Sequence, residues 1–297
     1  MRAAVGASSF AADSDKAMNL LAAHGIEVVK NPYGRKMNQE EIIEHLQGAD
    51  ALLAGLEPLN EEVFSKAPEL KAIARIGIGM DNIDLKAAEK YGIKVSNTPE
   101  GPTNAVAEMV LAALLAIGRQ IVPADRDMHE GIWKKRMGFS IAGLRILIVG
   151  YGHIGRKVGE VLSSLHAELL IYDKYNDKAS NCTLEEGLKI ADVVTLHASG
   201  RDQILTEERL ALTRPGAVIL NSARGGLVDE EALYRALKSG HLRAYWGDVF
   251  QKEPYHGKLA ECANALLTPH ISTYTVSCRE SMELQAAINL LEDLKNV

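Results

Sequence analysis

The chain has 297 residues, of which 47% are hydrophobic and 24% are charged, a balance typical of soluble globular proteins long enough for two domains. Its formal net charge is −6, and it contains no long block of Lys or Arg, so the composition favours neither a nucleic-acid nor a membrane partner. Three cysteines, Cys182, Cys262 and Cys278, form no C-x-x-C pair, and we expect no disulfide framework, no metal site and a cytoplasmic location.

Short runs of strand-forming residues alternate with amphipathic segments along the whole chain, which predicts βα units on parallel sheets. The chain is expected to begin with a strand and not with a signal peptide. The first five strands are predicted at Arg2–Val5, Ile26–Lys30, Ala51–Ala54, Lys71–Arg75 and Ile93–Val95. Helices are predicted between them, for example at Asp15–His24 and Gln39–Leu46. Five strands of this kind predict a compact flavodoxin-like domain.

A second series of strands follows, with the number typical of a full dinucleotide-binding sheet. Its members are predicted at Arg145–Gly150, Glu168–Asp173, Asp192–His197, Ala217–Asn221, Arg243–Val249 and Ala265–Thr268. The helical tail after Ser277 is too short for a domain, so we expect it to complete the first one. The chain is therefore predicted to be an α/β protein of two doubly wound parallel-sheet domains. A flavodoxin-like substrate domain would comprise residues 1–98 plus 272–297, and a Rossmann dinucleotide-binding domain residues 99–271.

Two proline-bearing stretches, 97–104 and 267–272, are expected to connect the domains, because proline disfavours helix in the residue before it. After the first stretch a helix is predicted over Thr103–Arg119, with the Thr103 hydroxyl as a candidate N-cap. Its apolar side chains cover more than one face, so it should be buried on more than one side. The strongly apolar run within it, Met109–Ile117, is too short to span a bilayer.

Residues 145–155 have the sequence RILIVGYGHIG, in which an apolar strand runs into a G-x-G-x-x-G pattern and an amphipathic helix follows. Gly150 allows the tight turn, Gly152 lets a pyrophosphate approach the backbone, and Gly155 lets the helix pack closely on the strand. The free amides of the helix N-terminus, at His153 and Ile154, would bind the pyrophosphate. These features predict a dinucleotide site.

The next strand ends at Asp173, which follows the last glycine of the pattern by 18 residues (173 − 155). A carboxylate at this distance bonds the adenosine ribose and repels a 2′-phosphate, so NAD is the expected cofactor. Lys174 leaves dual use with NADP open. The alternative is an ordinary βα turn that binds nothing, which the coincidence of strand, helix and acid disfavours.

Three later segments resemble the signature segments of the D-isomer-specific 2-hydroxyacid dehydrogenases. They are NSARGGLVDEEAL at 221–233, GDVFQKEP at 247–254 and TPHIS at 268–272. The segment RIGIGMDNID at 75–84, NTP at 97–99 and the predicted helix at 103–119 also match the family pattern. The resemblance covers the whole chain, and it implies an NAD-dependent enzyme that interconverts a small D-2-hydroxy acid and its 2-keto acid.

Hydride transfer to a keto acid needs a cation for the substrate, a proton donor for the new alkoxide, and a group that poises the donor. Arg224 offers a planar charged fork, and His270 is a side chain of the type that titrates near neutral pH. Glu253 can bond the second imidazole nitrogen. Each residue has an ordinary structural explanation by itself, but the family assigns these three roles to the Arg, Glu and His of the same motifs.

The resemblance implies further contacts at the carboxyl ends of the strands. Asp248 is similar to the family's acid that bonds the nicotinamide carboxamide. The other expected cofactor contacts are His197, Ala198, Ser222, Ala223 and Thr103. The family's usual proline two residues after the histidine is Ser199 here, and Gly247 replaces a larger aliphatic residue. These departures put local cofactor contacts in doubt.

The expected substrate contacts are the backbone amides of Gly77, Ile78 and Gly79, which resemble the family's cradle for the substrate carboxylate. Arg75 would add charge there or form a structural ion pair. Within the family the motifs are most similar to D-3-phosphoglycerate dehydrogenases of serine biosynthesis, in a short form without C-terminal regulatory domains. The basic cluster Trp133–Arg136 would then bind the substrate phosphate, or be a solvated turn. Glyoxylate/hydroxypyruvate reductase and D-lactate dehydrogenase remain alternatives.

Two alternatives from other classes also remain: a non-catalytic NADH-sensing protein similar to a corepressor, and a methyltransferase-like Rossmann enzyme. The family usually dimerises through its nucleotide domains, so a homodimer is expected. The helix Thr103–Arg119 and the arm Ile121–Phe139 would meet their symmetry mates. Alternatively, this helix is buried between the two domains of one chain.

Overall fold

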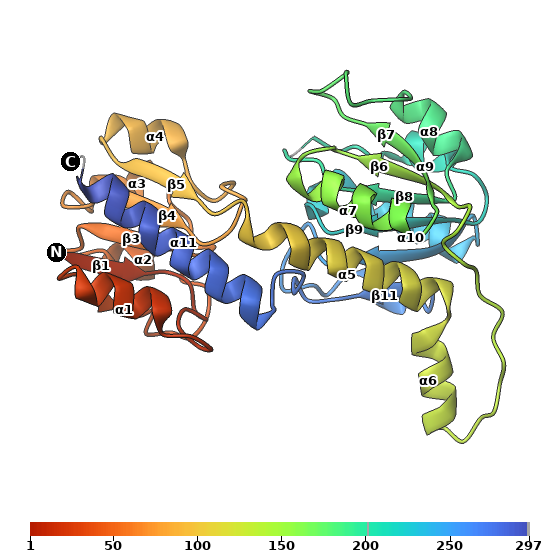
Figure 1. Ribbon diagram of the computed structural model, residues 1–297, viewed down its shortest axis with the longest axis horizontal. Coiled ribbons are helices and arrows are strands. Elements are labelled where there is room, and N and C mark those ends of the chain that lie inside the picture. The colour runs from red at the N-terminus through yellow and green to blue at the C-terminus, as the bar shows by residue number, and fades with distance from the viewer. Residues whose placement is uncertain (201, 296–297) are drawn as a thin grey trace. The chain divides into compact units, whose positions relative to one another are not determined.

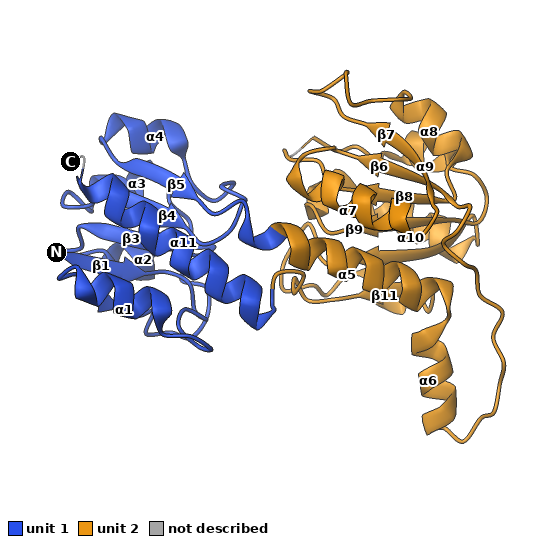
Figure 2. Ribbon diagram, viewed as in Figure 1, with its two compact units in different colours: residues 1–102, 274–297 blue, residues 103–273 orange. Residues whose placement is uncertain are grey.

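The computed structural model describes residues 1–200 and 202–295. Figure 2 divides the chain into two compact units, which we call unit 1 (residues 1–102 and 274–297) and unit 2 (residues 103–273). The boundaries expected from the sequence, after residues 98 and 271, lie four and two residues before those of the compact units. The chain thus leaves unit 1, completes unit 2 and returns to unit 1.

Unit 1 contains a five-stranded parallel sheet in the order β2-β1-β3-β4-β5. Its strands are β1 (Arg2–Val5), β2 (Glu27–Val29), β3 (Ala51–Ala54), β4 (Ala72–Arg75) and β5 (Lys94–Asn97). All five predicted strands are confirmed to within two residues. The three middle strands are almost entirely buried and rich in Ala, Val, Leu and Ile, as expected for parallel strands covered on both faces.

Helices cover both faces of this sheet (Figure 1). On one face lie α2 (Gln39–His45), α3 (Glu61–Ser65) and α4 (Leu85–Lys90), which pack on the sheet through a common apolar cluster. The helices α1 (Lys16–Ala23) and α11 (Val276–Lys295) pack against each other, and α11 also contacts β3, β4 and β5. The returning tail therefore supplies part of the second helical layer of unit 1.

Unit 2 contains a six-stranded parallel sheet in the order β11-β10-β9-β8-β6-β7. Its strands are β6 (Arg145–Val149), β7 (Glu168–Tyr172), β8 (Val193–Leu196), β9 (Ala217–Asn221), β10 (Leu242–Gly247) and β11 (Ala265–Leu267). The predicted fold class of two parallel-sheet α/β domains is confirmed. The order differs from the 3-2-1-4-5-6 order of many Rossmann sheets, since no strand of the described residues lies outside β7. Instead, Asn181 pairs with Ile171 on the free edge of β7. Its amide donates to the Ile171 carbonyl, and its side-chain oxygen accepts from the Ile171 amide.

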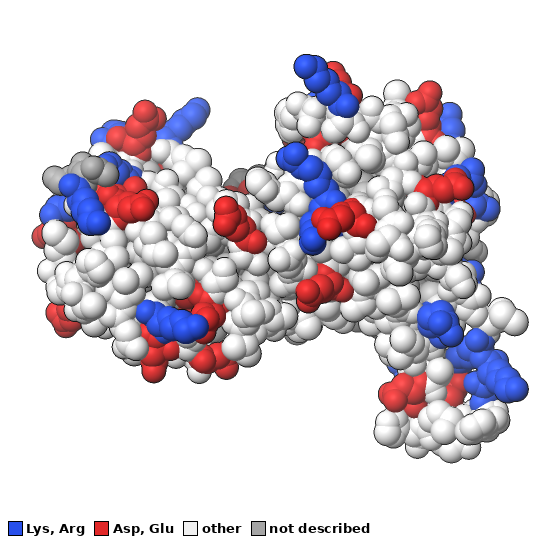
Figure 3. Space-filling view, in the orientation of Figure 1, with Lys and Arg blue, Asp and Glu red and all other residues white. Residues whose placement is uncertain are grey.

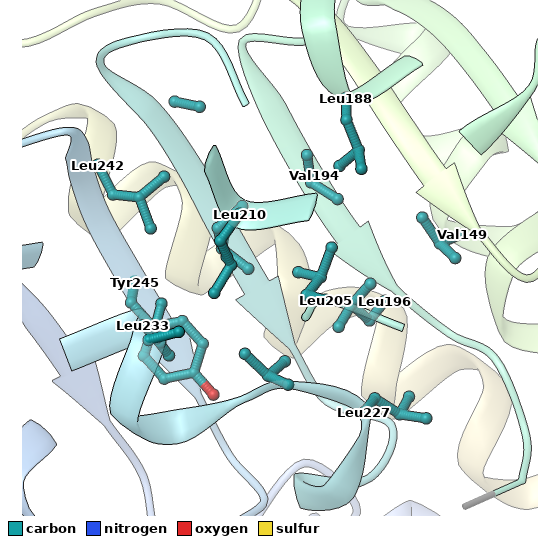
Figure 4. Packing of buried hydrophobic residues seen from close by; sticks show 14 of the residues in the cluster. Val149, Leu188, Val194, Leu196, Leu205, Leu210, Leu227, Leu233, Leu242 and Tyr245 are labelled. Atoms are coloured by element: carbon teal, nitrogen blue, oxygen red, sulfur yellow. The ribbon is translucent and has the colours of Figure 1, made fainter. Parts of the chain in front are cut away.

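Two helical layers cover the sheet of unit 2 as well. The first contains α5 (Gly101–Gly118) and α7 (His153–Ser164), and the second α8 (Leu184–Ile190), α9 (Glu207–Leu212) and α10 (Glu230–Lys238). Figure 4 shows the second layer, where Leu188, Leu210 and Leu233 from the three helices meet strand residues such as Val194. Two short 3-10 helices, η1 (Gly225–Leu227) and η2 (Lys258–Glu261), lie in the loops. Apart from Thr103, the predicted site residues of unit 2 follow the carboxyl ends of strands β6 to β11.

Helix α5 begins at Gly101, so Thr103 is its third residue and the predicted N-cap role of Thr103 is wrong. The helix starts earlier than predicted because Pro102 is well tolerated in a first turn, where no intrahelical N–H bond is needed. By length and apolar composition α5 resembles a membrane span, although half of it is buried. Its side chains Val106, Val110 and Leu114 belong to the apolar cluster on the sheet of unit 2, which accounts for that composition.

After α5 the chain forms an arm, residues 121–139, that leads away from the sheet of unit 2 (Figure 1). The first part of the arm is α6 (Ile121–His129). The amide of Phe139 donates to the Gly118 carbonyl at 2.8 Å, and a side chain at Gly138 would collide with the same carbonyl. The arm is therefore tied at both of its ends to the C-terminus of α5.

Candidate active site

The loop between β6 and α7 has the geometry that its glycines predict. Gly150 has a positive φ of 92°, and a side chain there would collide with the backbone of Ala198. A side chain at Gly155 would collide with the Gly150 carbonyl, whereas one at Gly152 would meet no atom within 4 Å. Gly152 precedes the first turn of α7 and offers no side-chain cap. Open space at Gly152 thus adjoins the start of α7, and the free amides of a helix's first turn are suited to binding an anion.

Two buried polar atoms near this loop have no hydrogen-bond partner among the described residues: His197 Nδ1 and Ser222 Oγ. Both residues follow strands that end at the same edge of the sheet, β8 and β9. Buried polar atoms are nearly always paired, so their presence here suits a ligand-binding edge. Burial lowers the pKa of His197 to about 3, and its Nε2 lies 2.9 Å from Thr195 Oγ1. The imidazole is therefore neutral at physiological pH.

Asp173 follows β7 and contacts the glycine loop directly. Its carboxylate accepts hydrogen bonds from the amides of Tyr151 at 2.7 Å and Tyr175 at 2.9 Å. Lys174, which in the sequence made use of NADP an open alternative, forms an ion pair with Asp202 at 3.4 Å. The charge next to the loop is thus the carboxylate, while the lysine is paired elsewhere. Together with the open glycine loop, these residues fit NAD.

Glu253 and His270, which are 17 residues apart, form a hydrogen-bonded pair. His270 Nδ1 lies 2.9 Å from Glu253 Oε2, and the side chains are 46% and 35% exposed, respectively. The other oxygen of Glu253, Oε1, accepts the amide of Phe250 at 3.1 Å. Because Nδ1 is engaged, Nε2 is the ring nitrogen left to exchange a proton with a bound molecule.

Arg224 lies in the loop after β9, and this loop packs against the one that carries Glu253. A side chain at Gly225 would collide with the backbone of Phe250 and Gln251, so the glycine permits this close approach. Within the loop, the side chain of the fully buried Asn221 donates to the Arg224 carbonyl at 2.9 Å. Arg224 Nη1 donates to the Ala223 carbonyl at 2.7 Å. The three predicted catalytic residues therefore all lie in unit 2, on neighbouring loops.

Asp248 is fully buried at the end of β10. Its Oδ1 accepts the Thr268 hydroxyl and the Ile271 amide, and its Oδ2 accepts the Ser272 amide and hydroxyl. The carboxylate thus already has four protein donors from the segment around His270. The sequence motif marks Asp248, but it does not reveal this network.

In unit 1 the predicted substrate residues form one loop after β4. Arg75 Nε donates to the Gly79 carbonyl at 3.1 Å, and its Nη1 bonds the Ile76 carbonyl. Gly77 donates its amide to the buried Thr98 hydroxyl at 2.8 Å. Among the described residues, the amides of Ile78 and Gly79 have no hydrogen-bond partner in the chain. The amides that remain for an anion are therefore those of Ile78 and Gly79.

Sequence analysis assigned no role to three polar residues that shape these loops: Asn221 in unit 2, and Thr98 and Glu57 in unit 1. All three are fully buried, and burial is what pattern analysis cannot see for a lone polar residue. Both carboxylate oxygens of Glu57 accept the Gly55 amide. Burial raises the pKa of this carboxyl.

The basic cluster Trp133–Arg136 lies in the arm of unit 2. Arg136 forms a two-pronged ion pair with the buried Asp127, at 2.8 and 2.9 Å. Lys134 and Lys135 are exposed. Figure 3 shows Lys and Arg side chains together with Asp and Glu on the projecting arm. Arg136 therefore stabilises the arm itself.

Comparison with known proteins shows clear relatives. A family model described as "D-isomer specific 2-hydroxyacid dehydrogenase, NAD binding domain" matches residues 111–272. The chain is 36% identical to glyoxylate reductase of Pyrococcus furiosus, over 86% of this chain and 83% of that protein. It is 36% identical to D-3-phosphoglycerate dehydrogenase of Mycobacterium bovis, over 88% of this chain and 53% of that protein. A solved structure from Thermus thermophilus has a TM-score of 0.91 and 34% identity, covering 100% of this chain and 97% of that one.

Proposed function

The chain belongs to the D-isomer-specific 2-hydroxyacid dehydrogenases, a family of NAD-dependent enzymes, and we propose that it reduces a small 2-keto acid through Arg224, Glu253 and His270. The observation that carries the proposal is the pairing of His270 with Glu253 at 2.9 Å, on loops adjoining that of Arg224. A partly exposed acid/base pair beside a cation, in a unit that binds a dinucleotide, suits hydride transfer to a carbonyl.

NADH, when bound at the loop 150–155, supplies the hydride for the carbonyl carbon. His270 donates the proton that the new alkoxide oxygen needs, from Nε2, while Glu253 holds Nδ1 and thereby the orientation of the ring. Arg224 binds the carboxylate of the keto acid and polarises its carbonyl, which a permanently charged guanidinium does well. Asp173 would hold the ribose of the cofactor. In the reverse direction His270 accepts the proton from the hydroxyl group of the acid.

Within unit 1, we propose the amides of Ile78 and Gly79 as a cradle for a carboxylate. Gly77 supports this cradle because its positive φ of 134° suits glycine, and a side chain there would approach Arg75 Nη1 within 2.9 Å. Arg75 contributes positive charge beside the cradle while its own hydrogen bonds hold the loop. On this proposal unit 1 is the substrate domain and unit 2 the dinucleotide-binding domain.

For the substrate we propose a small keto acid without a phosphate, such as glyoxylate or hydroxypyruvate. The sequence favoured D-3-phosphoglycerate because the motifs at 77–84 and 97–99 resemble those of its dehydrogenases. The cluster 133–136 adds less support for a phosphate than expected, because Arg136 is committed to Asp127. Arg75, the cation beside the proposed cradle, bonds the carbonyls of its own loop. The 36% identity to glyoxylate reductase of Pyrococcus furiosus is compatible with the same choice.

Phosphohydroxypyruvate is the second candidate. It is favoured by the exposed Lys134 and Lys135 and by the similarity to D-3-phosphoglycerate dehydrogenase. A panel of glyoxylate, hydroxypyruvate, phosphohydroxypyruvate, pyruvate and 2-oxoglutarate, each with NADH and with NADPH, distinguishes the candidates. We expect the highest kcat/KM with glyoxylate or hydroxypyruvate and NADH. A higher value with phosphohydroxypyruvate selects the second candidate, and no turnover of any member contradicts both.

We propose a cytoplasmic homodimer that buries the arm of unit 2. Several apolar side chains on the arm are strongly exposed in the single chain, which is unusual for a soluble monomer. They are Ile121 (53%), Met128 (56%), Ile132 (45%), Trp133 (81%) and Met137 (91%). A two-fold axis would bring the arms and the outer face of α5 together.

Light scattering at micromolar concentration tests the assembly. The chain has a mass of 32.2 kDa, so a dimer is expected at about 64 kDa, twice that mass. Trp133→Asp should shift the protein towards the monomer, because it would bury a charge in an apolar contact. Tyr175→Asp, a matched change of another strongly exposed aromatic residue outside the arm (80%), should leave the mass unchanged. A wild-type mass near 32 kDa contradicts the proposal.

A further inference from the structure

His270 lies between two hydroxyl residues, Thr268 and Ser272, that bond the same buried carboxylate. The Thr268 hydroxyl donates to Asp248 Oδ1 at 2.6 Å, and the Ser272 hydroxyl donates to Asp248 Oδ2 at 2.5 Å. The Ile271 amide at 2.9 Å and the Ser272 amide at 2.8 Å complete the set. The segment that carries His270 is thus fastened to β10 on both sides of the histidine.

The backbone of His270 needs such fastening. Its φ is 56°, in the left-handed region that residues with a side chain seldom occupy. Strained backbone of this kind persists only where the surroundings enforce it. The amide of His270 donates to the Thr268 carbonyl at 3.0 Å, so Thr268 holds the tight turn through its backbone and anchors it through its side chain.

The anchor is itself rigid. Asp248 is fully buried, and Trp246, also fully buried, donates its indole Nε1–H to Thr268 Oγ1 at 3.1 Å. The Thr268 hydroxyl thus accepts from the core of unit 2 and donates to the carboxylate. With two donors on each oxygen, the carboxylate is well satisfied within the protein.

Resting on the function proposed above, we infer that Thr268 and Ser272 are positioning residues, which act through Asp248 to hold His270 against Glu253. Asp248 accordingly serves the geometry of the acid/base pair. Without the two hydroxyl anchors, the turn at His270 is free to leave the left-handed region, and the imidazole moves relative to the substrate carbonyl. A misplacement of about 1 Å can reduce turnover about 10²-fold.

Single substitutions separate this role from packing and from cofactor binding. Thr268→Val keeps the shape of the side chain and removes the hydroxyl, whereas Thr268→Ser keeps the hydroxyl and removes a methyl group. Ser272→Ala removes the second anchor. Thr213→Val is a matched control, because Thr213 is a buried threonine of unit 2 whose hydroxyl donates to the Leu210 carbonyl at 2.7 Å. Thr213 precedes β9, whereas the site residues follow the carboxyl ends of the strands.

We expect Thr268→Val and Ser272→Ala to lose between about tenfold and about 10²-fold in kcat at saturating NADH. The KM for the keto acid and the affinity for NADH, measured by nicotinamide fluorescence, should change little. Thr268→Ser and Thr213→Val should retain kcat. The inference is overturned if Thr268→Val behaves as Thr213→Val does, if Thr268→Ser loses as much as Thr268→Val, or if the loss lies in NADH affinity alone.

A readout without turnover keeps this inference distinct from the proposed function. In a crystal structure of Thr268→Val or Ser272→Ala we expect His270 Nδ1 farther from Glu253 Oε2 than the present 2.9 Å, or a φ outside the left-handed region. Unchanged geometry in both variants contradicts the positioning role. If the wild type turns over no member of the substrate panel, the proposed function is contradicted. The crystal structures of the variants then still test whether Thr268 and Ser272 position His270.

Discussion

The loops at the carboxyl ends of the two parallel sheets differ in how many of their polar groups have hydrogen-bond partners within the protein. In unit 2 the glycine loop borders open space at Gly152, and His197 Nδ1 and Ser222 Oγ are buried without partners among the described residues. In unit 1 the loops bond one another, as Gly77 does with Thr98 and Asn82 with Glu57. The edge of unit 2 is thus open along the glycine loop. The loops of unit 1 close on one another but leave, among the described residues, the amides of Ile78 and Gly79 and the buried Ser96 Oγ without partners.

This difference explains why one site could be recognised in the sequence and the other only in outline. A dinucleotide imposes the same demands on every protein that binds it, and these demands appear as glycine spacing and a distant acid. A small keto acid leaves no comparable pattern, because a few backbone amides suffice to hold it. If unit 2 carries the chemistry, substitutions in its loops should change turnover and cofactor binding more than substitutions in unit 1 do.

The largest effect is expected at His270. His270→Ala should reduce kcat about 10²–10⁴-fold, as for loss of a general acid/base, while NADH binding stays near that of the wild type. His256→Ala serves as the control, since His256 is an exposed histidine only three residues after Glu253. Steady-state kinetics and nicotinamide fluorescence check both parts. A variant that retains most of its turnover would remove His270 from the mechanism.

Alanine substitutions of Gly152 and Gly155, in the loop between β6 and α7, should differ in their effects on stability and on NADH binding. Gly152→Ala adds a methyl group to open space, so it should leave Tm unchanged and weaken NADH binding by at least about tenfold, or about 1.4 kcal/mol. Gly155→Ala would collide with the Gly150 carbonyl and should lower Tm. Thermal unfolding and NADH titration of both variants measure this contrast. Equal NADH affinity of Gly152→Ala and the wild type would argue against a cofactor above that glycine.

Asp173→Ala should weaken the binding of NAD and raise the catalytic efficiency with NADP relative to that with NAD. The substitution removes the ribose contact and the charge that repels a 2′-phosphate. We expect the ratio of kcat/KM for NADPH to that for NADH to rise about tenfold, equivalent to about 1.4 kcal/mol. Asp173→Asn is the matched variant, because it keeps an acceptor for the Tyr151 amide and removes only the charge. Unchanged discrimination in both variants would show that another residue sets the preference.

The smallest effect concerns the loops of unit 1. Burial raises the pKa of Glu57 above its ordinary 4.5, so the folded protein keeps a proton that the unfolded chain loses. The stability from this group is present below pH 4.5 and is lost as the pH rises through the raised pKa. Between these limits the unfolding free energy of the wild type should fall relative to that of Glu57→Gln as the pH rises.

Urea unfolding at several pH values measures this difference. Glu89→Gln is the control, since Glu89 is an exposed glutamate of α4 in the same unit, and it should follow the wild type. Parallel pH profiles for the wild type and Glu57→Gln would contradict a proton held by the buried carboxyl.

The strands and the catalytic motif were accessible to sequence analysis because both are local patterns. Every predicted strand was found, since the buried parallel strands are short apolar runs bounded by turn residues. The start of α5 was misplaced by two residues, as is common where Gly and Pro begin a helix. Helix α6 was not predicted, because Pro123 and its polar composition obscure the helical period.

Other features depend on contacts that no local pattern reveals. The pairing of Arg136 with Asp127 requires the arm to fold back on itself, and this weakened the predicted phosphate site. The left-handed backbone of His270 and the four donors on Asp248 depend on loops that join only in the folded unit. Sequence analysis thus identified which residues to examine, and the structure revealed how they are held.

The most direct test of the central claim is the stereochemistry of one product. Hydroxypyruvate should be incubated with NADH and the enzyme, and the glycerate formed should be resolved by chiral chromatography. We expect oxidation of NADH together with formation of D-glycerate. Formation of L-glycerate, or no turnover of hydroxypyruvate or glyoxylate, would contradict this claim.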